Sequence, residues 1–430
     1  MTAAHFDLLL RDIRLPGASE AMCLATRGPR IAHIGPDAAL DAHETVTGGA
    51  ALLLPGLVEP HAHLDKNYSR DCLPEAGSSG RGALCDAIAA MREYKRQRSL
   101  ELVLARAERG LQRAVRAGVS VMRSHIDLGS AEELPVLQGM LDLAARWADR
   151  IQLEFTVLGN LSSNEGLAIC AEALQMGAVA VGGTPALCDA PQRAIDAALD
   201  LAGRYGRPLD LHIDETEDPA SPCLRYLAQR CIELDWDLPV AASHCCSLGF
   251  VEAPQRADTI ALLQRAGIGV ITLPACNLVL MGHGVQPAPR GIPPIRELLD
   301  AGVTVAVGSD NVQDPFQPWG DYDPLASAAL LAQVAQIGPR RSGELLAMVS
   351  EAPARALGLP AAGLTVGSAA HFSLLDCDDL HSALCEQPLR REVYFGGRRV
   401  LEQRLTTHWP QAHPCGQAIP QALPTTGDSR

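Results

Sequence analysis

The sequence predicts an α/β protein: a (β/α)8 barrel, or TIM barrel, with a small β-sandwich domain built from both ends of the chain. Eight β-rich runs alternate with Ala-, Leu- and Arg-rich helical stretches between about residues 57 and 350. Glycines stand just before several of these runs, and β-rich segments flank the repeats on both sides. Eight strands with crossover helices over roughly 250–300 residues are the pattern of a (β/α)8 barrel.

The eight expected strands are short and mostly apolar, as strands buried on both faces are. They cover residues 57–64, 119–128, 151–158, 178–182, 209–213, 240–244, 268–273 and 303–308. Segments between them, such as 99–118 and 191–206, have helical periodicity. Helices that end at a C-cap glycine are expected at Gly118, Gly177, Gly206, Gly267 and Gly302. A doubly wound sheet is the alternative, but no glycine-rich phosphate-binding motif follows the first strand.

The domain organisation follows from these runs. We expect residues 1–56 to form the first part of the sandwich, 57–360 the barrel, and 361–403 the second part of the sandwich. The Pro-, Gln- and Thr-rich residues 404–430 are expected to form a surface tail.

Composition limits the partners and the compartment. The chain has 430 residues and a formal net charge of −14, which argues against nucleic acid and anionic membranes as partners. No signal-peptide layout and no apolar run of about 18 residues is present, so we expect a cytoplasmic protein. Its 13 scattered cysteines contain no CxxC pair, which indicates reduced thiols. A homo-oligomer that acts on a small molecule is expected.

Histidines and carboxylates stand at the ends of four expected strands. His61 and His63 alternate at the end of the first strand, so both can reach one metal ion. His212, His244 and Asp310 end the fifth, sixth and eighth strands. Singly, each is more easily explained as a hydrogen-bonded histidine or a helix-capping aspartate. Together they converge, because the carboxyl ends of barrel strands meet at one site.

These segments carry a family resemblance. LVEPHAHLDK, VMRSHIDL, LHIDETED, AASHCCSLGF and VGSDNVQDPF occur here in the order seen in the amidohydrolase superfamily, and most closely resemble its cytosine deaminase branch. The resemblance implies one Fe(II) or Zn(II) ion held by His61, His63, His212 and Asp310. It also implies Glu215 as a proton shuttle and His244 beside the metal-bound water.

The lysine count supports one metal ion. Two-metal members of the superfamily bridge their ions with a carboxylated lysine, usually on the fourth strand. The fourth strand here reads GAVAVGGTP, and the only lysines of the chain are Lys66 and Lys95, outside that strand. A bridged pair of metal ions is therefore not expected.

The expected reaction is removal of an amino group from a small cytosine-like heterocycle by metal-bound hydroxide, with release of ammonia. Asp310 would accept the proton of the water, His244 would orient the hydroxide, and Glu215 would deliver a proton to the ring nitrogen. On its own, Glu215 reads as a solvated carboxylate within an acidic run. The alternatives are hydrolysis of a cyclic amide, removal of an N-alkylamine from a triazine-like ring, and a barrel that binds without turnover.

Several positions depart from the cytosine deaminase pattern and bear on the substrate. Asn311 stands where that family has a second Asp, and Phe316 stands where it has Trp. The family's Gln at the end of the third strand is absent, which leaves Asn160 or Asn164 as the nearby amides. We therefore expect Asn160, Asn311 and Phe316 to bind substrate, at a ring whose hydrogen-bonding edge differs from that of cytosine.

Two nearby residues allow two interpretations each. Lys66 contacts substrate or, more simply, pairs with Asp65, Asp71 or Glu75. His125 on the second strand supports the metal ligands or is hydrogen bonded in the core.

Overall fold

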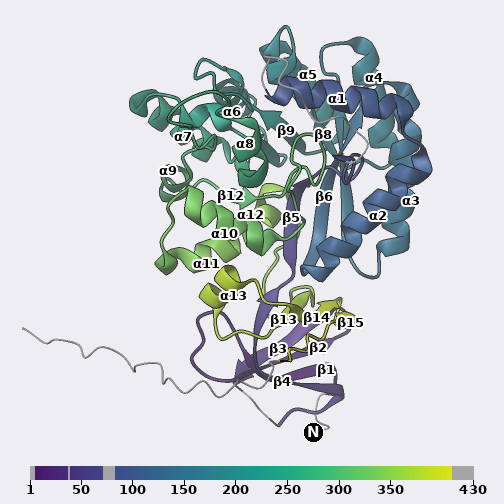
Figure 1. Cartoon of the computed structure of the whole chain (residues 1–430), viewed down its shortest axis with the longest axis vertical. Coiled ribbons are helices and arrows are strands. Elements are labelled where there is room, and N and C mark those ends of the chain that lie inside the picture. The colour runs from purple at the N-terminus through teal and green to yellow at the C-terminus, as the bar shows by residue number, and fades with distance from the viewer. Residues whose placement is uncertain (1–4, 37–38, 71–82, 409–430) are drawn as a thin grey trace, which may run out of the picture.

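The computed structural model describes residues 5–36, 39–70 and 83–408, and it contains two sheets (Figure 1). The larger sheet has eight parallel strands in consecutive order. They are β5 (Leu57–Ala62), β6 (Val119–Leu128), β7 (Gln152–Gly159), β8 (Ala180–Gly182), β9 (Leu209–Ile213), β10 (Val240–His244), β11 (Gly269–Thr272) and β12 (Val305–Val307). All eight predicted strands are present.

The sheet closes into a barrel beside the histidine motif. A parallel bridge pairs Ala62, at the end of β5, with Asp310, just after β12. The amide of Asp310 donates a hydrogen bond of 2.9 Å to the carbonyl of His61. The predicted (β/α)8 fold is confirmed, and its closure brings together two segments that lie about 250 residues apart in the sequence.

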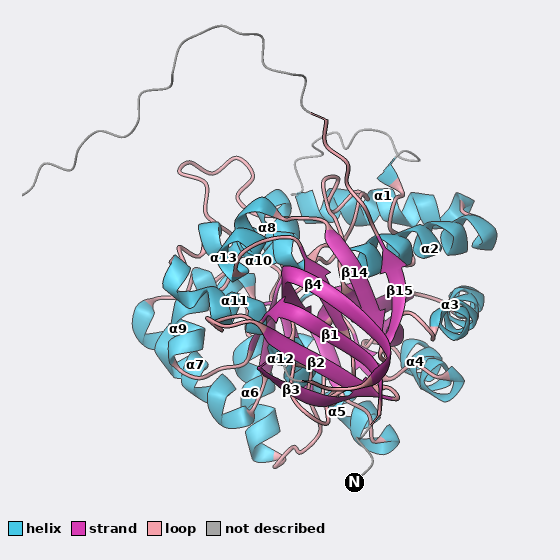
Figure 2. Ribbon diagram, turned by 90° about the horizontal axis from the view of Figure 1, so that it is seen from below, coloured by secondary structure: helices cyan, strands magenta, loops and turns pink. Residues whose placement is uncertain are grey.

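Helices surround the barrel (Figures 1 and 2). They are α1 (Ala83–Gln97), α2 (Leu100–Arg116), α3 (Leu134–Trp147), α4 (Asn164–Met176), α5 (Pro191–Tyr205), α6 (Cys223–Glu233), α7 (Ala253–Ala266), α8 (Pro274–Leu280), α9 (Ile295–Asp300), α10 (Pro324–Val334), α11 (Ser342–Ala347) and α12 (Glu351–Ala356). A further helix, α13 (Leu380–Glu386), connects two strands of the smaller sheet and lies between that sheet and the barrel (Figure 1). Short 3-10 turns are η2 (Ala131–Glu133), η3 (Pro185–Leu187), η4 (Cys246–Gly249) and η5 (Pro339–Arg341). Within the described residues, no helix has the length and apolar character needed to cross a membrane.

Helix α2 shows how the sequence produces these elements. The Ser99 side chain accepts a hydrogen bond from the amide of Leu102 and caps the first turn. The face with Val103, Ala107 and Leu111 is buried against the barrel, as the four-residue spacing predicts. The five predicted C-cap glycines all have positive φ: Gly118, Gly177, Gly206, Gly267 and Gly302.

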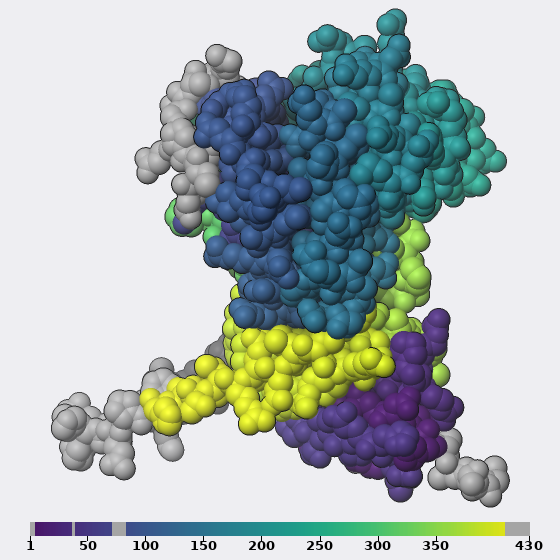
Figure 3. Space-filling view, turned by 90° about the vertical axis from the view of Figure 1, so that its right-hand side faces the viewer, coloured from purple at the N-terminus to yellow at the C-terminus, as the bar shows by residue number. Residues whose placement is uncertain are grey.

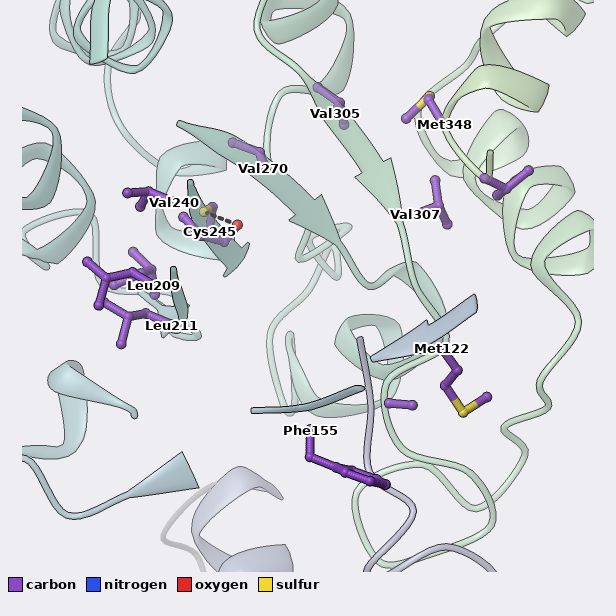
Figure 4. Packing of buried hydrophobic residues seen from close by; sticks show 14 of the residues in the cluster. Met122, Phe155, Leu209, Leu211, Val240, Cys245, Val270, Val305, Val307 and Met348 are labelled. Carbon is purple, nitrogen blue, oxygen red and sulfur yellow. Dashed lines mark hydrogen bonds between the residues drawn. The ribbon is translucent and has the colours of Figure 1, made fainter. Parts of the chain in front are cut away.

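Strand β9 explains why polar groups occur inside the barrel. Leu209, Leu211 and Ile213 join the large apolar cluster shared with the helices (Figure 4). Asp210 and His212 alternate with them and therefore face the other side of the strand. Apolar packing outside the barrel thus fixes the direction of the functional side chains inside it.

The smaller sheet combines both ends of the chain (Figures 2 and 3). Its order is β15-β14-β13-β4-β1-β2-β3. The strands are β1 (Phe6–Arg14), β2 (Met22–Arg27), β3 (Arg30–Pro36), β4 (Ala42–Pro55), β13 (Phe372–Leu375), β14 (Arg390–Phe395) and β15 (Arg398–Glu402).

One apolar cluster holds this sheet together. Leu8, Leu24, Leu53, Phe372 and Tyr394, from five of its strands, pack in that cluster, so the sheet curls around its own core. The predicted pairing of the two chain ends is confirmed. Residues 404–408 form no helix or strand, and the rest of the predicted tail lies outside the described residues.

The helix caps yield a stability prediction. Gly206 has φ 59° and Gly343 lies within α11, and a Cβ at either position would meet nothing within 4 Å. Gly206→Ala should therefore lower the free energy of unfolding by about 1–2 kcal/mol through backbone strain alone. Gly343→Ala should raise it by up to about 1 kcal/mol. Thermal unfolding midpoints that move in the same direction for both variants would contradict this reading of the caps.

Candidate active site

The predicted metal ligands converge at the carboxyl end of the barrel. His61 is the penultimate residue of β5, His63 follows that strand directly, His212 lies on β9, and Asp310 follows β12. Asp310 Oδ1 is 3.2 Å from His63 Nε2 and 3.6 Å from His61 Nε2. His212 Nε2 is 3.3 Å from His63 Nε2. His61, His63 and Asp310 thus offer ligand atoms that lie within 4.8 Å of one another, and His212 adjoins this group through its contact with His63. All four side chains are buried.

Three of the strand ends, those of β9, β10 and β12, hold strained backbone. His244 has φ 65° and Asp310 has φ 62°, in the left-handed region that residues other than glycine rarely adopt. Asp214 and Cys245, beside the same site, also have positive φ. Each such residue costs on the order of 1–3 kcal/mol and persists only where its surroundings enforce it. Strained backbone therefore marks the turns that direct His244 and Asp310 into the site.

Hydrogen bonds behind the ligands fix their orientation. Ser243 Oγ lies 2.9 Å from His61 Nδ1. When Nε2 of His61 is the ligand, Nδ1 carries the ring proton and donates a hydrogen bond to Ser243 Oγ. The carboxylate of Glu59, buried on β5, accepts hydrogen bonds from the amides of His61 and Ser309 at 3.1 and 3.0 Å. Glu59 therefore ties the first strand to the segment that carries Asp310.

Burial sets the charge of the imidazoles. It lowers the pKa of His61 and His212 well below the usual range, and neighbouring imidazoles lower it further. The pKa of His63 is lowered in the same way, by burial first and then by the charge of Lys66. These rings are neutral at pH 7, which is the form that binds a metal ion.

Glu215, His244 and Asn277 form a second group beside the ligands. His244 Nδ1 lies 3.4 Å from Glu215 Oε1 and accepts a hydrogen bond of 3.0 Å from the Asn277 amide. His244 Nε2 lies 4.0 Å from Asp310 Oδ2. Burial lowers the pKa of His244 to about 3. Burial, followed by the charge of Asp310, raises the pKa of Glu215 well above its usual range. Glu215 therefore retains a proton at a pH where an exposed glutamate would have lost it.

A cavity of about 660 Å³ opens onto these groups. His63, His212, Glu215, His244 and Asp310 line its inner end. The opposite walls come from α1 and from the loops after β6, β7 and β8. Its size lies within the range of small-molecule sites.

The structure brings the three expected substrate-binding residues to this cavity. Asn160, Asn311 and Phe316 all line it. Asn160 is exposed at the third strand's end, whereas Asn311 is buried and its amide nitrogen donates to Asp314. Asn164, the other candidate amide, is the first residue of α4 and does not line the cavity.

The structure also places the two residues whose interpretation was open. Lys66 is buried, lines the cavity, and has its Nζ 5.6 Å from the centre of the Phe316 ring. Asp71 and Glu75, two of its three expected ion-pair partners, lie outside the described residues. Its pKa is raised, since nearby carboxylates, led by Asp65, outweigh the opposing effect of burial.

His125 lies beneath the ligands. Its ring centre is 4.1 Å from that of His61, and its Nε2 is 3.5 Å from Asp210 Oδ1. Burial alone would raise the pKa of Asp210, but the charge of His125 and a hydrogen bond from it lower that pKa, so the interpretation of His125 as a hydrogen-bonded core histidine stays a prediction. Asp210 is held in turn by Thr156, whose hydroxyl donates at 3.2 Å.

Sequence reasoning missed Ser243, Asn277 and Cys276. Ser243 precedes His244 on β10, while Asn277 and Cys276 come from α8, after the seventh strand. Because neighbouring side chains of a strand point to opposite faces, and Ala242 faces outward, strand periodicity could have predicted that Ser243 faces the site. Asn277 and Cys276 enter from a short helix whose path the sequence pattern does not define.

The donor set fits one divalent metal ion. His61 Nε2 and both carboxylate oxygens of Asp310 are buried without a hydrogen-bond partner among the described residues. Imidazole nitrogen with carboxylate oxygen is a donor combination typical of Zn(II) and Fe(II) sites. A metal ion bound here would accept the free lone pairs of these buried nitrogen and oxygen atoms.

The sequence profile of the Amidohydrolase family matches residues 77–401, and the chain belongs to that family. The predicted resemblance to the cytosine deaminase-like branch of the superfamily is confirmed. The protein is a metal-dependent hydrolase of carbon–nitrogen bonds other than peptide bonds.

Three proteins of known activity are similar to this chain over most of its length. Pterin deaminase of Rhizobium rhizogenes is 30% identical over 360 residues, which cover 82% of this chain and 81% of that protein. The structure of 5-methylcytosine deaminase from Klebsiella pneumoniae superimposes with a TM-score of 0.86 at 28% identity, and covers 94% of this chain and 99% of that one. N-isopropylammelide isopropylaminohydrolase from Burkholderia multivorans superimposes with a TM-score of 0.80 at 30% identity, over 92% and 98% of the two chains.

The ligand geometry predicts the effect of removing one imidazole. His61→Ala should lose most of its bound metal, because the His61 ring would supply one of the four expected protein ligands. Elemental analysis of the purified variant measures this directly. His43→Ala, at an exposed position of β4, is the matched control and should keep the metal content of the wild type. Full metal occupancy in the His61 variant would rule out the ligand set.

Proposed function

We propose that this protein hydrolytically deaminates a small nitrogen heterocycle at an N=C–NH2 unit and releases ammonia. The observation that carries the proposal is the arrangement of Glu215 and His244 next to the buried ligand group, at the inner end of a cavity. Hydrolysis of such a unit needs a water nucleophile, a proton on the ring nitrogen and a protonated leaving amine. The site has a residue placed for each of these tasks.

The ligands and their neighbours would divide the work. His61, His63, His212 and Asp310 would hold one metal ion, which supplies hydroxide at neutral pH by lowering the pKa of water. Asp310, which faces both the ligands and His244, accepts the proton from the attacking water. His244, neutral and held by Asn277, orients the attacking oxygen and donates from Nε2 to the developing negative charge.

Glu215 is the proton shuttle in this proposal. Its raised pKa keeps it protonated to a higher pH than an exposed glutamate, and it lines the cavity at the ligand group. It gives its proton to the ring nitrogen as the water adds. The proton that Asp310 accepted from the water then passes to the leaving amine, and Glu215 takes up the remaining hydroxyl proton as ammonia departs and the C=O bond forms. A residue in this role needs a pKa close to the working pH.

Residues of the cavity walls would bind the substrate ring and determine which rings are accepted. Because the Asn311 amide nitrogen is bonded to Asp314, its carbonyl oxygen is the atom that remains to accept a hydrogen bond from the substrate. Phe316 offers an aromatic face, and Asn160 offers an amide at the outer part of the cavity. A volume of about 660 Å³ supports a fused bicyclic ring as well as a single cytosine-like ring. The relatives support both ring sizes, because one is named for a pterin, a fused bicyclic ring, and the other for 5-methylcytosine, a single ring.

The second candidate is removal of an alkylamine from a triazine-like ring. The similarity to N-isopropylammelide isopropylaminohydrolase, at 30% identity over 92% of this chain, favours it. Hydrolysis of a cyclic amide at the same centre is the remaining alternative. We also propose a cytoplasmic homo-oligomer, with Fe(II) or Zn(II) as the metal.

The shuttle assignment predicts a variant that separates metal binding from turnover. Glu215→Gln should keep its metal and lose about 10²–10⁴-fold in kcat, because the amide cannot transfer the proton. Glu217→Gln is the matched control: Glu217 accepts a hydrogen bond from the Gly282 amide, which glutamine can also accept. Near-normal activity of the Glu215 variant would remove Glu215 from this role.

The pH profile adds a second readout for Glu215. A raised pKa means that the protonated, active form persists to higher pH and is lost as the pH rises through that pKa. Wild-type kcat/KM should therefore fall on the alkaline side. The residual activity of Glu215→Gln should lack this alkaline fall. If the variant shows the same pH profile as the wild type, the alkaline fall arises from a group other than Glu215.

A substrate screen tests the reaction itself. The metal-loaded protein is assayed for ammonia release against pyrimidines, pterins, purines and amino-triazines, with alkylamine and ring-opened acid measured in parallel. Ammonia from a ring with an N=C–NH2 unit is the expected result. Alkylamine or a ring-opened acid as the product would favour the alternatives, and would contradict deamination.

A further inference from the structure

A second group of potential metal ligands lies on the far side of Asp310. Glu215, Cys276 and Asp310 each offer one ligand atom, and these three atoms lie within 4.8 Å of one another. Glu215 follows β9, Cys276 lies on α8, and Asp310 follows β12. The group shares only Asp310 with the histidine ligands.

The two oxygens of Asp310 face different neighbours. Oδ1 lies 3.2 and 3.6 Å from the Nε2 atoms of His63 and His61. The nearest nitrogen recorded for Oδ2 is His244 Nε2, at 4.0 Å. Neither oxygen has a hydrogen bond of normal geometry among the described residues, and the Cys276 thiol and the Asn311 amide lie close enough to act on the carboxylate. One carboxylate can therefore serve two cations, as bridging carboxylates do in sites where metal ions lie about 3.5–4 Å apart.

Cys276 gives this group its chemical character. The thiol is fully buried and packs on its other side against Cys246, Leu280 and Phe316. Among the described residues, no lysine or arginine forms an ion pair with Glu215 or Asp310 within 4.0 Å. Thiolate with carboxylate selects Zn²⁺ or Cd²⁺ over Mg²⁺. Since Glu215 and Asp310 line the cavity, a cation has a path to them.

We propose that Glu215, Cys276 and Asp310 form a second, inhibitory site for a thiophilic divalent cation such as Zn²⁺ or Cd²⁺. The thiol proton leaves to solvent as the sulfur binds the cation, and no electron is transferred. Occupation of this site holds the Glu215 carboxylate on the cation, where it can no longer carry a proton to substrate. The inhibitory effect rests on the proposed function, whereas binding of the second cation does not.

The experiment starts from protein loaded with one metal ion per chain. Cd²⁺ is added, the excess is removed, and bound metal is counted by elemental analysis. The ultraviolet absorbance of the cadmium–thiolate bond is followed in parallel. The variants are Cys276→Ala, Cys276→Ser and, as a matched control, Cys246→Ala, which removes the neighbouring buried thiol.

The wild type and Cys246→Ala should take up one more cadmium ion than Cys276→Ala, with a matching difference in thiolate absorbance. The concentration of Cd²⁺ or Zn²⁺ that halves the activity, normalised to each protein without added cation, should rise at least about tenfold in both Cys276 variants. Mg²⁺ should not inhibit any of the proteins.

Equal cadmium uptake and equal thiolate absorbance in the wild type and Cys276→Ala would overturn the site. Equal inhibition of all variants would do so as well. The metal count needs no turnover, so it tests the second site even if no heterocycle is deaminated. If the protein binds the second cation at Cys276 but releases ammonia from no heterocycle, the proposed function is contradicted and the second metal site is supported.

Discussion

A group of buried polar atoms without protein partners dominates the carboxyl end of the barrel. His61 Nε2, His244 Nε2 and both oxygens of Asp310 are enclosed with no hydrogen-bond partner among the described residues. An unsatisfied buried group costs about 1–3 kcal/mol, and more when it is charged. A bound cation removes that cost for the ligand atoms, so metal binding and stability of this end of the barrel should be coupled.

The rest of the fold holds these atoms in place. Leu209, Leu211 and Ile213 pack among the helices and thereby direct His212 inward. The bridge between Ala62 and Asp310 closes the barrel at the ligand group, and Glu59 joins the same two segments through backbone amides. The positive φ of His244 and Asp310 shows that tertiary packing overrides local backbone preference at the strand ends. The same enclosure raises the pKa of Glu215 and lowers that of His244, so burial favours the uncharged form of both residues.

The sequence predicted the parts that follow from periodicity and composition. All eight strands and all five C-cap glycines were predicted because alternation and helix termination are local properties. The ligand residues could be grouped because strand ends of a barrel meet at one rim. Cys276 and Asn277 could not be predicted, since they reach the site from a seven-residue helix whose direction depends on tertiary packing. The environment of Lys66 was equally hidden, because its position facing Phe316 depends on the segment after β12.

The central claim is that strand ends of a closed barrel hold one metal ion through His61, His63, His212 and Asp310. The most direct test is an anomalous-scattering map of crystals of the protein loaded with a single equivalent of Zn(II) or Fe(II). We predict one strong peak between the Nε2 atoms of the three histidines and a carboxylate oxygen of Asp310. A peak elsewhere, or a metal ion whose ligands exclude Asp310, would contradict the account.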